Sequence, residues 1–355
     1  MAVDTQLVFE RLVSLAAEQH ASDIHFSVGN PPALRKDGVI QHVNGESLVT
    51  PDGVAGVLEF LLPEELKDQF EREKEIAFSY VFQHSTRCRV EVYEQSSYPS
   101  ISIRLIPSEI PLLEALRLPG RVHAFTNLSK GLVLVSGPHG SGLSTTLASL
   151  IDRVNRDYAK HIVTIEHPIE YVVHDSQSVV EQREVGMDTH SFEHALEAVR
   201  RQDADVVMCS HIAGKGVIRH VLELAEAGHV VFGAMEVGSS VQVIEEIVAS
   251  FPEDERMQIR RMLGDTLEGI VVQRLVPRVG GGRILVAEVL IATPPVRALI
   301  REGRTAQIQN VLETSRDDGM MSLDQQLVEF VKTGEVLARV AEQYAVHPDD
   351  FRQRL

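Results

Sequence analysis

The stretch LVLVSGPHGSGLSTTLASLI, residues 132–151, constrains the fold more than any other part of the chain. An apolar run of strand length leads into a glycine-rich turn, and apolar residues at helical spacing follow. Glycines let successive backbone N–H groups point into one concavity, beside a helix N-terminus that favours anions. Strand, turn and helix in this order predict a phosphate-binding loop. The residues expected to surround a phosphate are Gly137, Gly140, Ser141, Gly142, Leu143, Ser144 and Thr145.

The loop departs from its usual pattern at one position. The pattern G-x-x-x-x-G-K-[ST] has a lysine where this chain has Leu143, whereas Ser144, expected to ligate Mg²⁺, and its supporting neighbour Thr145 are present. Loss of the lysine's charge-assisted hydrogen bond predicts nucleotide binding weaker by about ten- to a hundredfold. Either Leu143 has joined the apolar stripe of the following helix, or another cation substitutes for the lysine. The candidates for such a cation are Lys130, Lys215 and His139.

Length and composition exclude several classes of protein. A chain of 355 residues predicts about two domains. A net charge of −17 disfavours nucleic acid as a partner, because binding a polyanion requires clustered Lys and Arg. Cys88 and Cys209 occur without any CxxC, which excludes a disulfide framework and a four-cysteine zinc site and favours the cytoplasm. The first residues lack the basic region of a signal peptide, and no uncharged apolar run reaches ~18 residues, so no membrane insertion is expected.

The periodicity of the chain changes twice. A helix over residues 5–19, a strand at 22–27 and alternating patterns at 87–93 and 101–105 predict an N-terminal α+β domain whose sheet has one polar side. Beyond a proline-containing linker, apolar strands alternate with helical segments, which predicts an α/β domain, and from about residue 294 only helices are expected. The predicted strands of the α/β domain are 132–136, 162–165, 205–209, 230–234 and 284–289. The predicted boundaries are 1–108, linker 109–118, 119–293 and 294–355.

The sequence HSFEH, residues 190–194, matches the zinc signature H-x-x-E-H. At helical spacing His190, His194, Glu197 and Arg201 share one side, while apolar residues occupy the other. This arrangement is typical of a solvated helix face. We therefore expect no zinc here.

Five segments in order resemble the secretion-type hexameric ATPases, most closely the type IV pilus retraction motors of the PilT/PilU group. They are SGPHGSGLSTTLASLID (Walker A), TIEHPIEYV (Asp box), AVRRQDADVVMCSHIAG (Walker B), AGHVVFGAMEV (His box) and PPVRALIRE, a helix that marks retraction members. Residues from AAEQHASDIHFSVGNPPALRKDGVI resemble the start of the family's N-terminal domain. The resemblance implies a RecA-like P-loop NTPase core with an N-terminal PAS-like α+β domain and a helical C-terminal part.

The resemblance also assigns roles to particular residues. Glu166 matches the Asp-box glutamate that positions or activates the attacking water, and His229 matches the first His-box histidine. The N-terminal domain of the family supplies arginine fingers to a neighbour's nucleotide. The residues at or near those positions are Arg87, Arg89 and Arg104. The alternative for these arginines is a solvated face, with Arg89 paired to Glu91.

Four family positions carry other residues, namely Leu143, His167, His211 and Glu236. His167 stands for an aspartate, His211 for the Walker B glutamate and Glu236 for the second His-box histidine. His211 could be a buried neutral histidine that fills the space of the glutamate. Because phosphoryl transfer depends on positioning and charge stabilisation, these changes predict weak or absent ATP hydrolysis.

The family further implies ATP or ADP with Mg²⁺, if nucleotide binding is retained, and a cytoplasmic protein held at the inner membrane through partners. The expected partners are further subunits of a homomeric or heteromeric hexamer that includes an active paralogous ATPase, and the pilus platform protein. Two alternatives to an impaired subunit remain: an active hexameric ATPase with a rearranged site, and a docking scaffold independent of nucleotide.

Overall fold

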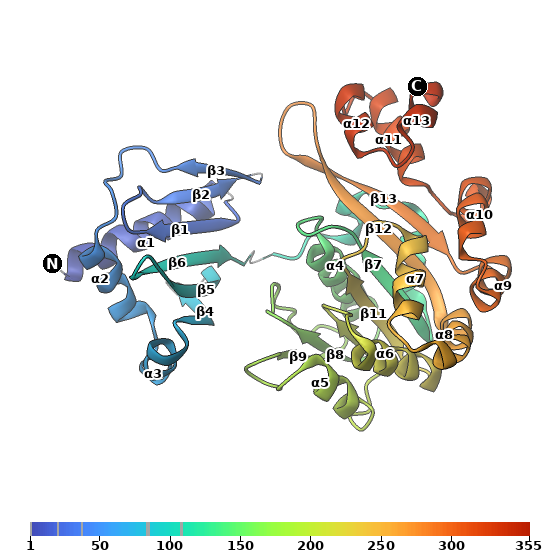
Figure 1. Cartoon of the computed structure of the whole chain (residues 1–355), viewed down its shortest axis with the longest axis horizontal. Coiled ribbons are helices and arrows are strands. Elements are labelled where there is room, and N and C mark those ends of the chain that lie inside the picture. Colours follow the sequence, from blue (N-terminus) through green and yellow to red (C-terminus); the bar gives the residue numbers. More distant parts are fainter. Residues whose placement is uncertain (1, 20, 37, 83–85, 107–108) are drawn as a thin grey trace. The chain divides into compact units, whose positions relative to one another are not determined.

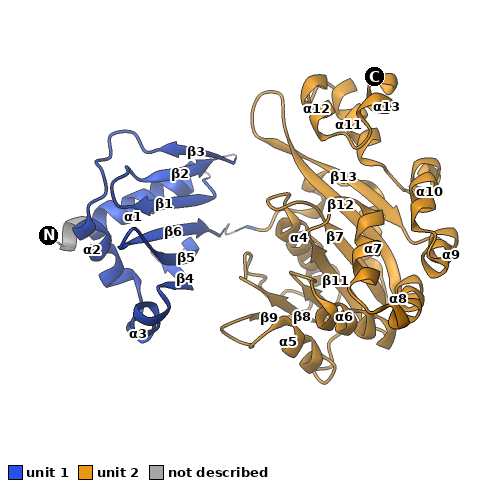
Figure 2. Cartoon of the chain, viewed as in Figure 1, with its two compact units in different colours: residues 1–109 blue, residues 110–355 orange. Residues whose placement is uncertain are grey.

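The chain forms two compact units, residues 1–109 and 110–355, which are coloured separately in Figure 2. The computed structural model describes residues 2–19, 21–36, 38–82, 86–106 and 109–355. Figure 1 labels the elements within each unit. Among the described helices, none combines the length and apolar character needed to cross a membrane.

Unit 1 is an antiparallel sheet with helices on one face. Its elements are α1 (Ala2–Glu18), β1 (Asp23–Ser27), β2 (Ala33–Lys36), β3 (Val39–His42), α2 (Pro51–Leu61), α3 (Glu64–Glu73), β4 (Glu75–Phe82), β5 (Thr86–Gln95) and β6 (Tyr98–Leu105). The strand order is β3-β2-β1-β6-β5-β4. Val90 and Ile103 are fully buried against apolar residues of α1 and α2, whereas Arg104 and Glu91 lie on the other face. The predicted sheet with one polar side is therefore observed.

Unit 2 contains a seven-stranded sheet of order β13-β12-β7-β11-β10-β8-β9. All neighbouring strands are parallel except β12 and β13. The strands are β7 (Gly131–Ser136), β8 (His161–Glu166), β9 (Val179–Glu184), β10 (Val206–Cys209), β11 (Val230–Met235), β12 (Leu267–Pro277) and β13 (Arg283–Ile291). The α-helices are α4 (Leu143–Asp157), α5 (Phe192–Val199), α6 (Lys215–Ala227), α7 (Ser240–Ala249), α8 (Glu253–Thr266), α9 (Pro294–Glu302), α10 (Ile308–Thr314), α11 (Leu323–Lys332), α12 (Ala338–Tyr344) and α13 (Pro348–Arg354). The 3-10 helices are η1 (Leu113–Leu116), η2 (Gly120–Asn127), η3 (Thr305–Gln307) and η4 (Arg316–Asp318).

Both faces of the unit 2 sheet are buried, and alternate residues of β7 serve different cores. Leu132 and Leu134 pack with apolar residues of α5, α6, α7 and α8. Val133 and Val135 pack with α4, η1 and η2 on the opposite face. A central strand covered on both sides is read in sequence as a continuous apolar run, which is why LVLV carries no alternation. The last helices enclose a smaller core around the outer ends of β12 and β13.

The predicted strands of the α/β domain are all present, but two further strands were not predicted. The strand β12 begins at Leu267, directly after helix α8 ends at Thr266, so no turn residues separate the two elements. The strand β9 lies at the edge of the sheet and carries polar residues, which weakens its apolar pattern. Helices and 3-10 turns alone form residues 294–355, as predicted, apart from a single bridge between Val289 and Met321.

The predicted linker, 109–118, is largely part of unit 2. Unit 2 begins at Ile110, and Leu113 and Leu118 are buried in the core that lies over α4. Apolar side chains close to the prolines explain why this segment packs. Residues 107 and 108 lie outside the described residues. Residues 294–355 cluster with the same unit rather than forming a separate one.

Candidate functional site

The parallel strands of unit 2 end at one edge of the sheet, and several of the residues predicted to be functional lie at or just beyond those ends. Ser136 of β7 lies level with Met235 of β11, and Cys209 of β10 lies level with Ile165 of β8. The glycine-rich loop, Glu236, His211 and Glu166 therefore share the carboxyl edge. In open parallel sheets this edge is where ligands bind.

The loop of residues 137–142 has the backbone conformation of a phosphate cradle. Gly137, Gly140 and Gly142 have φ values of 153°, 76° and 89°, which side chains disfavour. A Cβ at Gly137 would lie 2.3 Å from the carbonyl oxygen of Gln273, so only glycine fits. The tip of the loop is exposed, and α4 starts at residue 143 with its free N–H groups facing the loop. The backbone thus fits a phosphate group.

The side chain of Leu143 packs against the apolar core between α4 and the sheet. This contact favours the interpretation that Leu143 has joined the apolar stripe of its helix.

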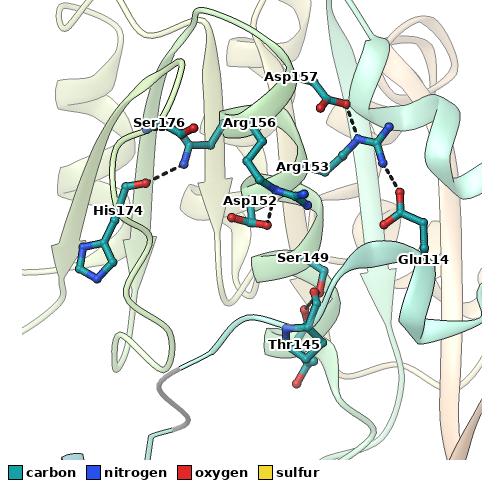
Figure 3. A network of polar contacts seen from close by, with 11 residues as sticks. Glu114, Thr145, Ser149, Asp152, Arg153, Arg156, Asp157, His174 and Ser176 are labelled. Atoms are coloured by element: carbon teal, nitrogen blue, oxygen red, sulfur yellow. Dashed lines mark hydrogen bonds and ion pairs between the residues drawn. The ribbon is translucent and has the colours of Figure 1, made fainter. Parts of the chain in front are cut away.

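Polar contacts also hold helix α4 to neighbouring segments along its length, as Figure 3 shows. Ser149 donates to the carbonyl oxygen of Pro111 at 2.7 Å, Arg153 pairs with Glu114, and Asn155 donates to the carbonyl oxygen of His174 at 2.8 Å.

Two of the three candidate replacement cations lie away from the loop or are paired, and only His139 lies on the loop itself. Lys130 precedes β7 and therefore lies at the amino edge of the sheet, opposite the loop. Lys215 donates to Glu255 at 2.6 Å and lies over the ring of Phe251. His139 lies on the loop itself, with its Nδ1 3.6 Å from a carboxylate oxygen of Glu236.

Glu166 ends β8 and is 6% exposed. Thr164 and Gln182 donate to its Oε1 at 2.6 Å and 2.9 Å. Burial raises the pKa of Glu166 to about 7, since the two hydrogen bonds, which favour the charged form, offset only part of the desolvation. A carboxyl group with a pKa near neutrality can accept a proton from water, which is the task expected of this residue.

Two of the substituted positions, His167 and His211, lie just beyond the ends of the neighbouring strands β8 and β10. The backbone N–H of His167 donates to Oγ of Ser210 at 3.2 Å, and its ring Nδ1 lies 3.0 Å from the carbonyl oxygen of Val185. His211 is exposed, so the interpretation as a buried neutral histidine is wrong. Its ring lies 6.1 Å from that of Phe192. An exposed imidazole at this position supplies no carboxylate oxygen for Mg²⁺, which prefers such ligands.

Glu236 follows β11 and is held beside the loop by its backbone neighbours. The hydroxyl of Ser136, fully buried at the end of β7, donates to the carbonyl oxygens of Met235 at 2.9 Å and Val237 at 2.8 Å. It also accepts from the N–H of Val237 at 3.2 Å. The carboxylate of Glu236 therefore lies next to the exposed tip of the loop, where it opposes an anionic ligand.

His229 precedes β11, so within this chain it lies at the amino edge, away from the loop. Its carbonyl oxygen accepts from the N–H of Gly131 at the start of β7, and its ring Nδ1 lies 2.9 Å from the carbonyl oxygen of Leu224. The structure thus does not bring His229 to the other site residues. Its position directly before an apolar strand, which is visible in the sequence, already indicates that it lies at the edge of the sheet opposite the phosphate loop.

The three arginines of unit 1 occupy the polar face of its sheet. Arg89 pairs with Glu91 at 3.3 Å, with its own side chain only 15% exposed, and Arg104 pairs with Asp23 at 3.0 Å. Nε of Arg87 is buried without a hydrogen-bond partner among the described residues. The carboxylates hold two of the guanidinium groups in place without removing their charge.

The HSFEH segment is a solvated turn and helix start. Ser191 caps α5, and the side chains of His190 and His194 are exposed, with ring centroids 5.8 Å apart. Within the described residues, no three His, Cys, Asp or Glu side chains are arranged to hold a metal ion.

Two residues that sequence reasoning missed support the loop. Gln273 of β12 is fully buried and hydrogen-bonds both Ser141 and Thr146. The hydroxyl of Tyr171 lies 2.9 Å from Oγ1 of Thr145, so Thr145 is engaged by the Asp-box segment. A glutamine inside an apolar run was the available signal for Gln273, but its strand was not predicted.

Comparisons with known proteins cover almost the whole chain. The family model described as type II/IV secretion system protein matches residues 3–342. The chain is 36% identical over 340 residues to the type IV pilus retraction ATPase PilT of Pseudomonas aeruginosa, covering 96% of this chain and 98% of that protein. It is 33% identical to the type IV pilus ATPase PilU of the same organism, covering 97% and 90%.

The fold agrees with a solved relative. The crystal structure of the pilus retraction motor PilT with bound ADP superposes with a TM-score of 0.88 at 35% identity, covering 97% of this chain and 98% of that one. This likeness confirms the predicted fold class, a RecA-like core with an N-terminal α+β domain and a helical C-terminal part. The chain belongs to the type II/IV secretion system protein family and is, within it, a PilT/PilU-like member of the pilus retraction ATPases.

Proposed function

We propose that this chain is a catalytically impaired subunit or regulator of type IV pilus retraction and of the twitching motility that depends on it. The observation that carries the proposal is that an apolar side chain, Leu143, occupies the position of the loop lysine and packs, partly buried, against the apolar core. The cradle keeps its backbone donors but has lost its mobile positive charge. Glu236 adds a negative charge at the loop tip. Both changes oppose the binding of a triphosphate.

The magnesium side of the site supports the same conclusion. Ser144 remains as a hydroxyl ligand, but the position that carries a carboxylate in the family is occupied by the exposed His211. Phosphoryl transfer leaves the protein little to do beyond positioning and charge stabilisation. Removal of the loop cation and of the carboxylate on the metal side takes away two sources of that stabilisation. If nucleotide is retained, ATP or ADP with Mg²⁺ is the ligand.

An impaired subunit can still act within a ring. Arg87, Arg89 and Arg104 lie on one polar face of unit 1 and belong to the part of the chain that supplies arginine fingers in the family. Such a finger is worth about 10³–10⁵ in rate. We expect a hexamer with an active paralogous ATPase, cytoplasmic and docked on the inner-membrane pilus platform protein.

An active ATPase is the second candidate, because the environment of Glu166 is intact. Its pKa of about 7 suits a residue that takes a proton from water. Under this alternative, wild-type protein hydrolyses ATP with Mg²⁺, and Glu166→Gln removes the activity.

The test combines calorimetric titration of ATP with Mg²⁺ and turnover assays. It compares wild type with the double variant Leu143→Lys, His211→Glu. We expect weak or undetectable binding and turnover in the wild type, and affinity about ten- to a hundredfold higher in the double variant. Leu143→Met is the matched control, since it keeps the apolar contact and adds no charge.

Wild-type turnover that Glu166→Gln abolishes would reject the proposal in favour of an active ATPase. If neither wild type nor the double variant binds nucleotide, and oligomers form equally with and without ATP, the chain is a docking scaffold. If ATP affinity rises in Leu143→Met as well as in the double variant, the missing positive charge is not the cause of weak nucleotide binding.

A further inference from the structure

Gln273 lies in the middle of β12, beside the end of β7 and the phosphate loop. Its neighbour Val272 pairs with Ser136, the last residue of β7 before the loop. The side chain of Gln273 is 0% exposed, and the strand around it is apolar. A primary amide buried in such a strand is costly unless both of its ends are hydrogen-bonded.

The nitrogen and the oxygen of this amide both form hydrogen bonds, one to the loop and one to the start of the helix that follows it. Nε2 of Gln273 donates to the carbonyl oxygen of Ser141 at 3.1 Å, inside the loop. Oε1 of Gln273 accepts from the hydroxyl of Thr146 at 2.9 Å, in the first turn of α4. One side chain thus joins the loop to the start of its helix across Gly142.

The backbone of Gln273 supports the other end of the loop. Its carbonyl oxygen lies 2.3 Å from the place of a Cβ at Gly137, so the loop leaves β7 in direct contact with β12. Ser141 is itself buried, and its hydroxyl has no partner among the described residues. The backbone of Ser141, rather than its side chain, therefore holds this turn: its N–H donates to the carbonyl oxygen of Pro138 at 3.1 Å, and its carbonyl oxygen accepts from Gln273.

We infer that Gln273 is a positioning residue that keeps the phosphate loop in its cradle conformation in a chain without a loop lysine. Its amide bridges the carbonyl oxygen of Ser141 and the hydroxyl of Thr146, which ties the end of the loop to the first turn of α4. The inference rests on the proposed function only in taking phosphate as the ligand of the loop. The order of the loop itself can be measured without any ligand.

The first test is hydrogen–deuterium exchange of the nucleotide-free, full-length protein. In Gln273→Leu, amides of residues 137–146 should exchange about tenfold faster than in wild type, because the carbonyl of Ser141 and the hydroxyl of Thr146 lose their partner. Thr146→Val removes one of the two contacts with little change of volume and should give a smaller acceleration in the same segment. It keeps the inference testable if Gln273→Leu does not fold.

The matched control is Gln326→Leu. Gln326 is also buried, and its Oε1 accepts from the backbone N–H of Ala287, in the part of the molecule formed by β13 and α11. This variant should accelerate exchange near Ala287 and leave residues 137–146 unchanged. The inference is overturned if both Gln273→Leu and Thr146→Val leave loop exchange at the wild-type rate, or if Gln326→Leu accelerates the loop equally.

A second readout separates this inference from the proposed function. Gln273→Leu added to the Leu143→Lys, His211→Glu variant should weaken binding of ATP with Mg²⁺ about tenfold, and Gln326→Leu should not. Equal affinity with and without Gln273→Leu counts against the inference. If the double variant binds no ATP, the proposed function fails, while the exchange experiment still decides the role of Gln273.

Discussion

The ends of β8 and β10 are neighbours in one parallel sheet, yet the candidate site residues at these two ends differ in their burial and in their surroundings. Glu166, at the end of β8, is 6% exposed and is held by Thr164 and Gln182. His211, just beyond β10, is exposed. Ile165 and Cys209 pair directly, so the two residues lie at the same edge of the sheet.

This difference indicates how the site changed. A buried carboxyl group is tied to its hydrogen-bond donors, and exchanging it leaves buried partners unsatisfied. The partners of an exposed side chain can be replaced by water, so a glutamate there can be exchanged for histidine at little cost to the fold. The substituted positions His167, His211 and Glu236 are all exposed, whereas Glu166 is buried and retained. Leu143, the fourth of these positions, is partly buried against the core over α4, so burial distinguishes Glu166 only from the three exposed positions.

The largest expected effect tests whether the end of β8 is still functional. In the Leu143→Lys, His211→Glu background, Glu166→Gln should lower ATP turnover at least about a hundredfold, since general base catalysis contributes about 10²–10⁴. Steady-state phosphate release measures the effect. The control is Glu181→Gln, an exposed acid on the neighbouring edge strand β9. Equal turnover in Glu166→Gln and its parent would mean that the buried carboxyl group is structural.

A smaller expected effect is that the free energy of unfolding depends on pH through the ionisation of Glu166. The pKa of Glu166 is raised from 4.5 to about 7 in the folded protein, so folding favours the protonated form. The resulting stability is fully present below pH 4.5 and is lost as pH rises through about 7. Relative to Glu166→Gln, the wild type should lose up to about 3 kcal/mol of unfolding free energy over this range.

Urea denaturation at a series of pH values measures this difference. Glu181→Gln again serves as the control, because an exposed acid should show no comparable dependence. A constant difference between wild type and Glu166→Gln from pH 4.5 to 8 would contradict burial of an ionisable group at the end of β8. It would also weaken the argument that burial preserved this residue.

The sequence was sufficient to predict the loop, the positions of most strands and the solvated face of the HSFEH segment. These features depend on local patterns: glycine spacing, apolar runs and helical periodicity. It was not sufficient for Gln273 and Tyr171, because their roles come from strands and loops far away in the chain. No turn residues separate strand β12 from the helix before it, so the strand was not predicted. The position of Gln273 beside the loop could therefore not be predicted either.

The predicted roles of His229 and of the linker show a second limit of prediction from sequence motifs. A motif match assigns a residue to a site without regard to which edge of the sheet it occupies, and His229 precedes its strand. Three prolines suggested a free connection, whereas Leu113 and Leu118 anchor residues 110–118 in the core above α4. In both cases, the deciding information was the position of apolar residues next to the motif.

The smallest expected effect concerns Glu236, the exposed acid at the loop tip. It is 53% exposed and 3.6 Å from His139, so solvent screens most of its field. In the Leu143→Lys, His211→Glu background, Glu236→Gln should raise ATP affinity about two- to fivefold, and the gain should shrink as salt is added. Glu226→Gln, an exposed acid at the other edge of the sheet, should have no effect. A gain of a hundredfold or more would mean that this exposed carboxylate, rather than Leu143, is the main barrier to nucleotide, and that burial is the wrong criterion for ranking the substituted positions.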